Sequence, residues 1–399
     1  MSKPKIRVKG FEKDWDSFDL GVFADVVNDK NSDNAISEVF TNSASLGIIS
    51  QRDYFNHDIA KQDKIHGYSV VSPNDFVYNP RVSVTAPVGP ISKNRLGRSG
   101  AMSPLYTIFR THDINDVFLE HYFKTHYWYK YMRFNGNTGA RFDRFAISLS
   151  HFFKMGIPVP QDSVQRIIAE TFELIDKEIY VSQDKINSLK SLKICHLNRL
   201  FPIGGGKTPP MRIEGFTEDW KEAELGDCFD ERQERSSEGE LLSVTIGNGI
   251  MRFSELNRHD NSSADKSNYK VVCKGDIVYN SMRMWQGASG YSEYDGIVSP
   301  AYTVLIPREG INSKFFAYFF KNPEMINTFR INSQGMTSDT WNLKYPAFSK
   351  IKIRFPKDPE EQLKIAEYFE NLNEAIRLHE EELERLKSLK ESCLQGMFV

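Results

Sequence analysis

The feature that most constrains the fold of this chain is an internal repeat with a period of about 200 residues. Short segments of the first half recur in the same order in the second half: Gly10–Trp15 with Gly215–Trp220, Asp75–Asn79 with Asp276–Asn280, Ser103–Thr107 with Ser299–Thr303, Ile168–Phe172 with Ile365–Phe369, and Leu189–Lys193 with Leu386–Lys390. These segments are mostly apolar or turn-like, so they specify a fold. The stretches between them, such as 28–70 and 231–270, differ freely. The pattern is typical of one scaffold used twice with different surfaces.

Each half opens with a segment of mixed strands and helices. Asp75–Asn79 and its copy Asp276–Asn280 follow turn residues and are rich in β-branched and aromatic side chains, so we expect matched strands there. A second matched strand is expected over 105–109 and 301–306. Apolar and aromatic residues at spacings of three and four predict helices over 118–131 and 314–329. The sequence therefore predicts an α+β fold in each half.

Each half then closes with a long helix, preceded by Pro160 in the first half and by Pro356 in the second. Apolar residues alternate spacings of four and three along both helices, which is the 3.5-residue period of a coiled coil. We expect the two helices to pair antiparallel about a pseudo-twofold axis. The predicted helix-pairing seam consists of Ile168, Phe172, Ile175, Ile179, Ile186, Leu189, Ile365, Phe369, Leu372, Ile376, Leu383 and Leu386.

The predicted architecture is two homologous α/β domains in tandem, each followed by a spacer helix. The segment Pro202–Pro210, rich in glycine and proline, reads as a flexible linker between the halves. The expected boundaries are 1–155 for the first domain, 156–200 for the first spacer helix, 201–211 for the linker, 212–350 for the second domain and 351–399 for the second spacer helix.

Composition and spacing argue against several classes of protein. The formal net charge is −2, so a DNA-binding role needs its cations on one face or a partner that supplies more. The four cysteines, Cys195, Cys228, Cys273 and Cys393, form no CxxC pair and read as free thiols, which excludes a zinc ribbon on spacing. The polar N-terminus and the lack of a long apolar run predict a cytoplasmic protein without a membrane span.

We find no sequence signature of catalysis or metal binding. Gly206-Lys207-Thr208 resembles the end of a phosphate-binding loop, but Phe201 stands where its first glycine belongs, and Pro209 and Pro210 follow where a helix must open. Asn79-Pro80-Arg81-Val82 lacks the second proline and the aromatic residue of a base-flipping methyltransferase loop. His121 and His126 are five residues apart, off a common helical face, and read as partly exposed surface histidines.

The chain resembles the specificity (S) subunits of type I restriction-modification systems along essentially its whole length. The resemblance rests on Ile6–Phe11 with Trp15 and Leu20-Gly21, on Gly275–Asn280, and on Ile351–Pro356 followed by Glu361–Ala366. The first half is the weaker copy, because Val164-Gln165-Arg166 stands where the second half has Glu361-Gln362-Leu363.

This resemblance implies a non-catalytic subunit with two target-recognition domains, each reading half of a bipartite double-stranded DNA sequence. It implies that the helices set the gap between the half-sites and dock two methyltransferase subunits, through which motor-nuclease subunits join. S-adenosylmethionine, ATP and Mg would be bound by those partners and none of them by this chain. The implied biological role is DNA methylation and host defence.

Base-edge contacts in DNA are made mostly by Arg, Lys, Asn and Gln. We expect such residues on the variable loops, and the densest basic loop is 92–98. Each residue could equally be an ordinary solvated charge. The candidate DNA-binding residues are Arg81, Lys93, Arg95, Arg98, Arg141, Arg144, Arg252, Arg258, Lys266, Arg283, Arg330 and Gln334.

Two other functions fit parts of the pattern. A two-headed scaffold that binds proteins across a coiled coil would show the same repeat and the same heptads. Sequence-selective binding to duplex DNA separates it from a specificity subunit. A fused modification enzyme is opposed by the missing methyltransferase motifs, and methyl transfer by the isolated chain would revive it.

Overall fold

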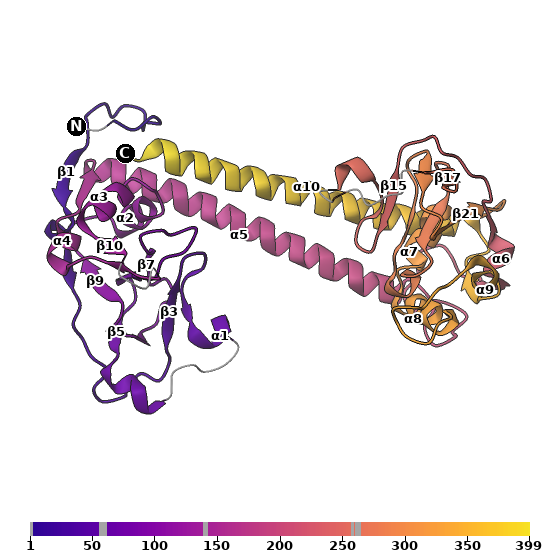
Figure 1. Cartoon of the computed structure of the whole chain (residues 1–399), viewed down its shortest axis with the longest axis horizontal. Coiled ribbons are helices and arrows are strands. Elements are labelled where there is room, and N and C mark those ends of the chain that lie inside the picture. Colours follow the sequence, from indigo (N-terminus) through magenta and orange to yellow (C-terminus); the bar gives the residue numbers. More distant parts are fainter. Residues whose placement is uncertain (1–2, 56–61, 139–142, 257–258, 260–264) are drawn as a thin grey trace. The chain divides into compact units, whose positions relative to one another are not determined.

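The computed structural model describes residues 3–55, 62–138, 143–256, 259 and 265–399. The chain divides into two compact units (Figure 1). Unit 1 consists of Met1–Ser182 and Glu382–Val399, and unit 2 consists of Gln183–Glu381. Each unit therefore contains one mixed domain, the first part of one long helix and the last part of the other.

Unit 1 is built around an antiparallel four-stranded sheet of order β2-β9-β6-β7. Its central strand β6 is Phe-Val-Tyr with all three side chains buried, as suits a strand covered on both faces. The sheet strands are β2 (Ala24–Val26), β9 (Thr107–Thr111), β6 (Phe76–Tyr78) and β7 (Ile91–Lys93). The paired strands beside the sheet are β1 (Asp16–Asp19) with β12 (Gly156–Val159), β3 (Phe40–Ser43) with β4 (Gly47–Ser50), β5 (Ser69–Val71) with β8 (Gly100–Met102), and β10 (Asn137–Thr138) with β11 (Phe145–Ala146).

Unit 2 repeats this arrangement with a sheet of order β14-β21-β18-β19. Its sheet strands are β14 (Phe229–Glu231), β21 (Tyr302–Pro307), β18 (Ile277–Asn280) and β19 (Ser289–Tyr291). The further pairs are β13 (Lys221–Glu224) with β22 (Lys352–Phe355), β15 (Leu242–Thr245) with β16 (Gly249–Arg252), and β17 (Lys270–Val272) with β20 (Gly296–Val298). The repeat and the α+β class are confirmed, and the matched strands β6 and β18 lie within the predicted segments.

The helices predicted over 118–131 and 314–329 are each broken into two. In unit 2 the break falls at Asn322-Pro323, because a residue before proline avoids the helical conformation. Asn322 then caps the new helix with its side-chain oxygen. The observed helices are α2 (Asp116–Phe123), α3 (Tyr129–Asn135), α7 (Ser313–Phe319) and α8 (Pro323–Asn332). The shorter elements are α1 (Gln51–Phe55), α4 (Leu149–Phe153), α6 (Leu225–Cys228), α9 (Tyr345–Phe348), η1 (Leu20–Val22), η2 (Gln62–Gly67), η3 (Phe253–Glu255) and η4 (Met284–Gln286).

The long helices begin later than the predicted residues 156 and 351. The segment Gly156–Val159 forms strand β12, which pairs with β1, because Pro158 and Pro160 exclude a helix interior there. Strand β22 has the same role before the second helix, where it pairs with β13. Helix α5 then spans Asp162–Arg199 and helix α10 spans Pro359–Met397.

Within each unit the two long helices run antiparallel. In unit 1, Phe172 on α5 stacks on Phe398, and Asp176 pairs with Lys390. The order is the same in unit 2, where the partner residues on α10 again fall in number as those on α5 rise: Lys190 pairs with Glu380 at 2.7 Å, and His196 contacts Tyr368. Every residue of the predicted seam is buried or half-buried.

Each domain core is completed by the helix that arrives from the other half of the chain. In unit 1 the end of α10, with Leu394, Met397 and Phe398, packs into the core around Trp15 and Phe118. The end of α5 does the same in unit 2, where the fully buried Phe201 stacks on Phe319 and Phe369. The predicted linker 201–211 therefore begins inside a core. It is also held by Glu324, which accepts two hydrogen bonds from the Gly204 amide.

Candidate nucleic-acid interface

Two segments of unit 1 that are far apart in sequence meet beside the sheet. The loop after β6 and the segment before β11 form an isolated bridge between Arg81 and Arg144. The Phe145 amide donates to the Pro80 carbonyl at 2.7 Å, and the Val82 amide donates to the Asp143 carbonyl at 3.1 Å. Two residues predicted to touch DNA are thus directly opposite each other, and cross-strand partners project to the same side.

This pairing places like charges next to each other, which destabilises a sheet unless an anion lies between them. The exposed Arg81 has no carboxylate partner among the described residues. The buried Nε of Arg144 has no hydrogen-bond partner there, and its nearest carboxylate oxygen, on Asp143, is 3.9 Å away. A planar guanidinium without a hydrogen-bond partner is suited to bind a phosphate or the O6 and N7 atoms of guanine.

The same two segments meet in unit 2, with different side chains. The Leu343 amide donates to the Ser281 carbonyl at 2.9 Å, and Gln334 and Asn342 exchange backbone hydrogen bonds at 3.0 and 2.8 Å. The exposed Arg283 precedes η4, which packs on α8. Trp285 and Trp341, which the sequence reasoning missed, pack edge to face at this place with ring centroids 5.1 Å apart. The surface is richer in amide and aromatic groups than its counterpart in unit 1.

The basic loop 92–98 is tied down by carboxylates. Lys93 is buried and its ammonium lies 2.6 Å from Asp116. Arg95 pairs with Glu120 at 2.7 Å, and Arg98 holds Glu38 with two hydrogen bonds of 2.7 Å. Their roles in DNA binding remain predictions, and these contacts give each of the three side chains a structural role as well.

The other predicted residues are scattered. Arg252 pairs with Glu240 at 3.1 Å and lies over the Tyr294 ring, and Lys266 is half-buried before β17. Arg330, on α8, hydrogen-bonds Asn327 one turn earlier. Arg141 and Arg258 lie outside the described residues.

Sequence reasoning also missed a basic hollow of about 600 Å³ in unit 1. It lies between α3 and the loop after β6, and its basic residues are His126, Lys130 and Arg133. The neighbouring Phe134 is 89% exposed. The sequence hides this signal, because the spacing of apolar residues predicts a single helix over 118–131. The break at 124–128 instead turns a basic face of α3 toward that loop.

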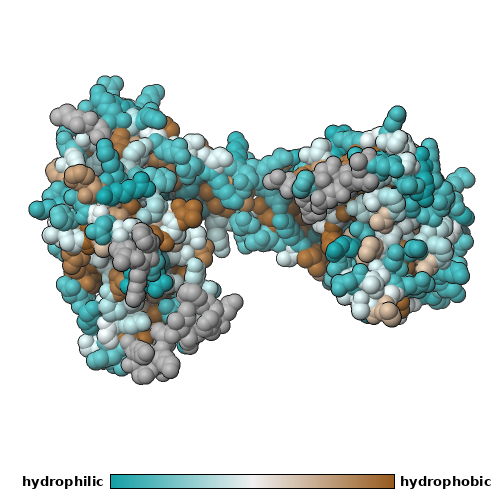
Figure 2. Space-filling model, in the orientation of Figure 1, coloured by the Kyte–Doolittle hydropathy of each residue, from teal (hydrophilic) through white to brown (hydrophobic). Residues whose placement is uncertain are grey.

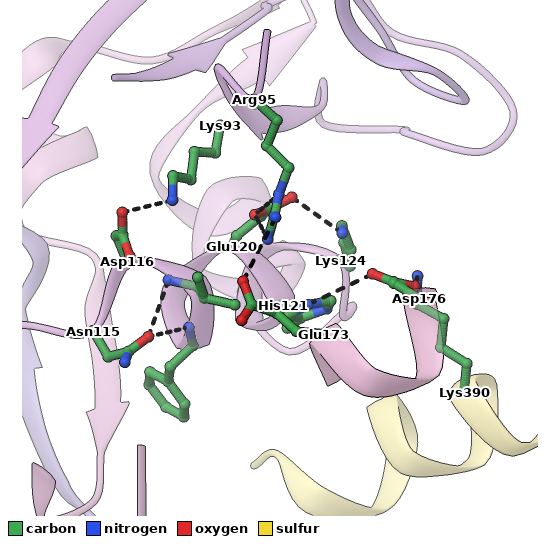
Figure 3. Close-up of polar contacts among 12 residues, drawn as sticks. Lys93, Arg95, Asn115, Asp116, Glu120, His121, Lys124, Glu173, Asp176 and Lys390 are labelled. Atoms are coloured by element: carbon green, nitrogen blue, oxygen red, sulfur yellow. Dashed lines mark hydrogen bonds and ion pairs between the residues drawn. The ribbon is translucent and has the colours of Figure 1, made fainter. Parts of the chain in front are cut away.

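The prediction that His121 is a surface residue was wrong. Its ring is fully buried and stacks on Phe172 with centroids 4.3 Å apart. Figure 3 shows the ring beside Asp176. Burial lowers the pKa of His121 to about 2, with a smaller effect from the nearby Lys124 and Lys390. Asp176 lies 3.9 Å from Nε2, but this carboxylate is paired with Lys390, so the imidazole is neutral.

Within the described part of the chain there is neither a metal-ligand cluster nor a helix that could span a membrane. There, no three His, Cys, Asp or Glu side chains are grouped so that they could hold a metal ion. Among the described helices, none combines the length and the apolar character needed to cross a membrane. The four cysteines are unpaired.

Comparison with known proteins gives a family match for part of the chain and similar folds among solved structures. Residues 217–388 match the family described as the type I restriction modification DNA specificity domain. The fold is similar to that of a type I restriction-modification S subunit from M. genitalium, with a TM-score of 0.58, 15% identity, and coverage of 100% of this chain and 99% of that one. It is also similar to a structure described as the basis of complex assembly and conformational transition of the type I R-M system, with a TM-score of 0.52, 15% identity, and coverage of 96% and 97%. No curated protein matches the chain.

Proposed function

We propose that this chain, whose residues 217–388 match the type I restriction modification DNA specificity domain, reads a bipartite DNA target with one domain per half-site. The observation that supports this most is the contrast between the two units. The same backbone frame brings two loops together in each unit, but the loops carry Arg81 and Arg144 in one and Arg283 and Asn342 in the other. One scaffold with two different polar surfaces suits two different short sequences.

The phosphate contacts of the proposed complex are shared with partners. A net charge of −2 leaves little excess positive charge, whereas strong DNA binding rests on many Lys and Arg contacts to phosphate. We therefore propose that two methyltransferase subunits enclose the DNA and that motor-nuclease subunits join through them. S-adenosylmethionine, ATP and Mg would belong to those subunits.

The outer face of α5 supports docking of such partners. Leu174 and Tyr180 in unit 1 and Ile194 in unit 2 are each more than half exposed. Apolar patches interrupt the mostly hydrophilic surface of the long helices (Figure 2). Large apolar side chains left in solvent on a helix are suited to a protein interface.

The test is a genome-wide map of adenine methylation in the source organism with and without this gene. We expect a motif of two short blocks around a fixed gap to disappear on deletion. If a motif is found, Arg81→Ala with Arg144→Ala should relax one block only, and Arg166→Ala, an exposed arginine on α5, serves as the matched control. If methylation is unchanged while the partner genes are expressed, the protein-binding scaffold becomes the better hypothesis.

A further inference from the structure

Unit 2 contains a pocket of about 760 Å³ whose lining carries five basic side chains. Helices α5, α7 and α10 form its walls, together with strand β19 and the tip of the β15–β16 hairpin at 247–249. The volume is in the range of pockets that hold small-molecule ligands and cofactors. The basic lining residues are Lys190, Lys193, Lys314, Lys321 and Arg377.

Two of these cations have no carboxylate partner. Lys321 donates to two backbone carbonyls, at Ile246 with 3.0 Å and at Gly287. Within the described part of the chain, Lys193 has neither an ion pair nor a hydrogen bond. The other three are neutralised: Lys190 by Glu380 at 2.7 Å, Lys314 by Glu293 and Glu370, and Arg377 by Glu374 and Glu381.

At the equivalent place in unit 1, both lysines have carboxylate partners, which unit 2 lacks. Lys124, the counterpart of Lys321, pairs with Glu120 at 3.1 Å, and Lys390, the counterpart of Lys193, pairs with Asp176 (Figure 3). Both lysines are thus kept in the two copies. Both carboxylates are lost in unit 2, where Ala317 stands for Glu120 and Asn373 stands for Asp176.

The loss leaves a positive charge that burial makes unfavourable. Burial lowers the pKa of Lys321 to about 8, with the charge of Lys193 as the second cause, and burial also lowers the pKa of Lys193. An ammonium removed from water needs an anion or several hydrogen bonds to offset its lost hydration. The Asn373 amide donates to the Tyr318 hydroxyl at 2.8 Å, so the hydroxyl proton is free to donate to a ligand.

We propose that this pocket binds a phosphate-bearing ligand of nucleotide size, with the phosphoryl group between Lys193 and Lys321 and the Tyr318 hydroxyl as an additional donor. The phosphoryl group could belong to a free nucleotide or to a nucleic-acid backbone, and the experiment separates these sources. The proposal does not rest on the bipartite recognition function, because its readout is binding by the isolated chain.

The test is calorimetric titration of the full chain with inorganic phosphate, AMP and a 20-base-pair duplex without terminal phosphates. The central variant is Ala317→Glu with Asn373→Asp, which installs the carboxylates of unit 1 in unit 2. We expect its affinity for the bound probe to fall at least tenfold, as should that of Lys193→Met. Lys390→Met, the matched change in unit 1, should leave that affinity unchanged. Circular dichroism checks that each variant is folded.

Comparing the three probes identifies whether the phosphoryl group belongs to a free nucleotide or to a nucleic-acid backbone. A tenfold loss of AMP and phosphate binding supports a free nucleotide, and a loss confined to the duplex supports backbone phosphate. At pH 9, where Lys321 is mostly neutral, binding should take up a proton, so the apparent enthalpy should depend on the buffer. The groups around Lys321 that bear on this titration are Lys193, Lys190, Lys314, Glu293, Glu370 and Arg377. No binding of any probe by the wild-type chain, or equal binding by the double carboxylate variant, would overturn the proposal.

Discussion

At the scale of single residues, one difference between the two copies is a buried ion pair. Glu361 is 2% exposed and accepts two hydrogen bonds from Arg212, at 2.8 and 2.9 Å, and one from the Trp220 indole. In the first copy Val164 takes its place, and Arg7 instead lies 3.8 Å from Asp14. The neighbouring glutamines, Gln165 and Gln362, keep the same bonds to the backbone in both units. The sequence difference between Val164 and Glu361 is therefore the loss of one buried ion pair.

Glu361→Gln should destabilise unit 2 by on the order of 3 kcal/mol, because it leaves the mostly buried guanidinium of Arg212 without a counter-charge. Urea denaturation followed by tryptophan fluorescence measures the change. Glu360→Gln is the matched control, since Glu360 is exposed and its pair with Lys364 spans 3.7 Å. Equal effects of the two changes would contradict the assignment.

His121→Tyr should make unit 1 less sensitive to acid. Tyr318 occupies the equivalent position in unit 2, so the ring fits the scaffold. The folded-state pKa of His121, about 2, is below the unfolded value near 6.5, so the unfolded chain binds the extra proton. Stability is then lost as the pH falls below about 6.5, by up to about 1.4 kcal/mol per pH unit. The charged groups facing the ring are Asp176, Lys390, Lys124 and Arg95.

Urea denaturation of both proteins between pH 4 and pH 8 tests this expectation. The difference in stability should be constant above pH 7 and should shift in favour of the variant below pH 6. A difference that does not change with pH would show that the pKa of His121 is the same in the folded and unfolded chain, which contradicts the lowered pKa.

At the scale of elements, the long helices act as parts of two cores as well as spacers. The heptads predicted two paired helices. In addition, the residue that follows the end of each helix packs in the domain core that belongs to the other half of the chain. Phe398 packs in unit 1 and Phe201 packs in unit 2, at equivalent positions of the repeat. The sequence did not indicate this role for Phe201, because the following glycines and prolines marked the whole stretch as a linker. Likewise, local periodicity could not reveal the break between α2 and α3, which depends on tertiary contacts.

Phe398→Ala should destabilise unit 1 by about 3–5 kcal/mol, the usual range for truncating a buried phenylalanine. Phe201→Ala should do the same in unit 2. Hydrogen exchange measured by mass spectrometry can assign each loss to its unit. Phe134→Ala, at a side chain that is 89% exposed, should change neither. If Phe398→Ala increased hydrogen exchange in unit 2 alone, the packing of Phe398 in the core of unit 1 would be contradicted.

At the scale of the whole molecule, the sequence predicts the repeat, the α+β class and the two long helices. Each of them depends on apolar residues that recur at regular positions along the chain. The candidate interface could be predicted only in part. Arg81 and Arg144 were singled out individually, but their pairing depends on a contact across more than sixty residues. Lys93 and Arg98 looked like free charges because their partners, Asp116 and Glu38, are distant in sequence.

If the proposed function holds, exchanging residues 225–350 for those of a type I specificity subunit should change one half-site of the target and leave the other intact. The exchange begins after β13, because β13 pairs with β22 and a boundary at 212 would join strands of different origin. Methylation mapping of a host that carries the hybrid gene provides the readout. Loss of both half-sites in a folded hybrid would contradict independent reading by the two domains.

The two ends of the chain meet in unit 1. The Ile6 amide donates to the Gly396 carbonyl at 2.8 Å, and the Tyr127 hydroxyl donates to the Gln395 carbonyl at 2.7 Å. A short peptide could therefore join the termini as the segment 201–211 already joins the halves, and the backbone then has no preferred starting point. A gene opened between the two halves, with a linker between residues 399 and 1, would encode a circular permutant with the same pair of cores. In such a fold, the order of the two domains along the gene can change while the folded protein keeps the same two units.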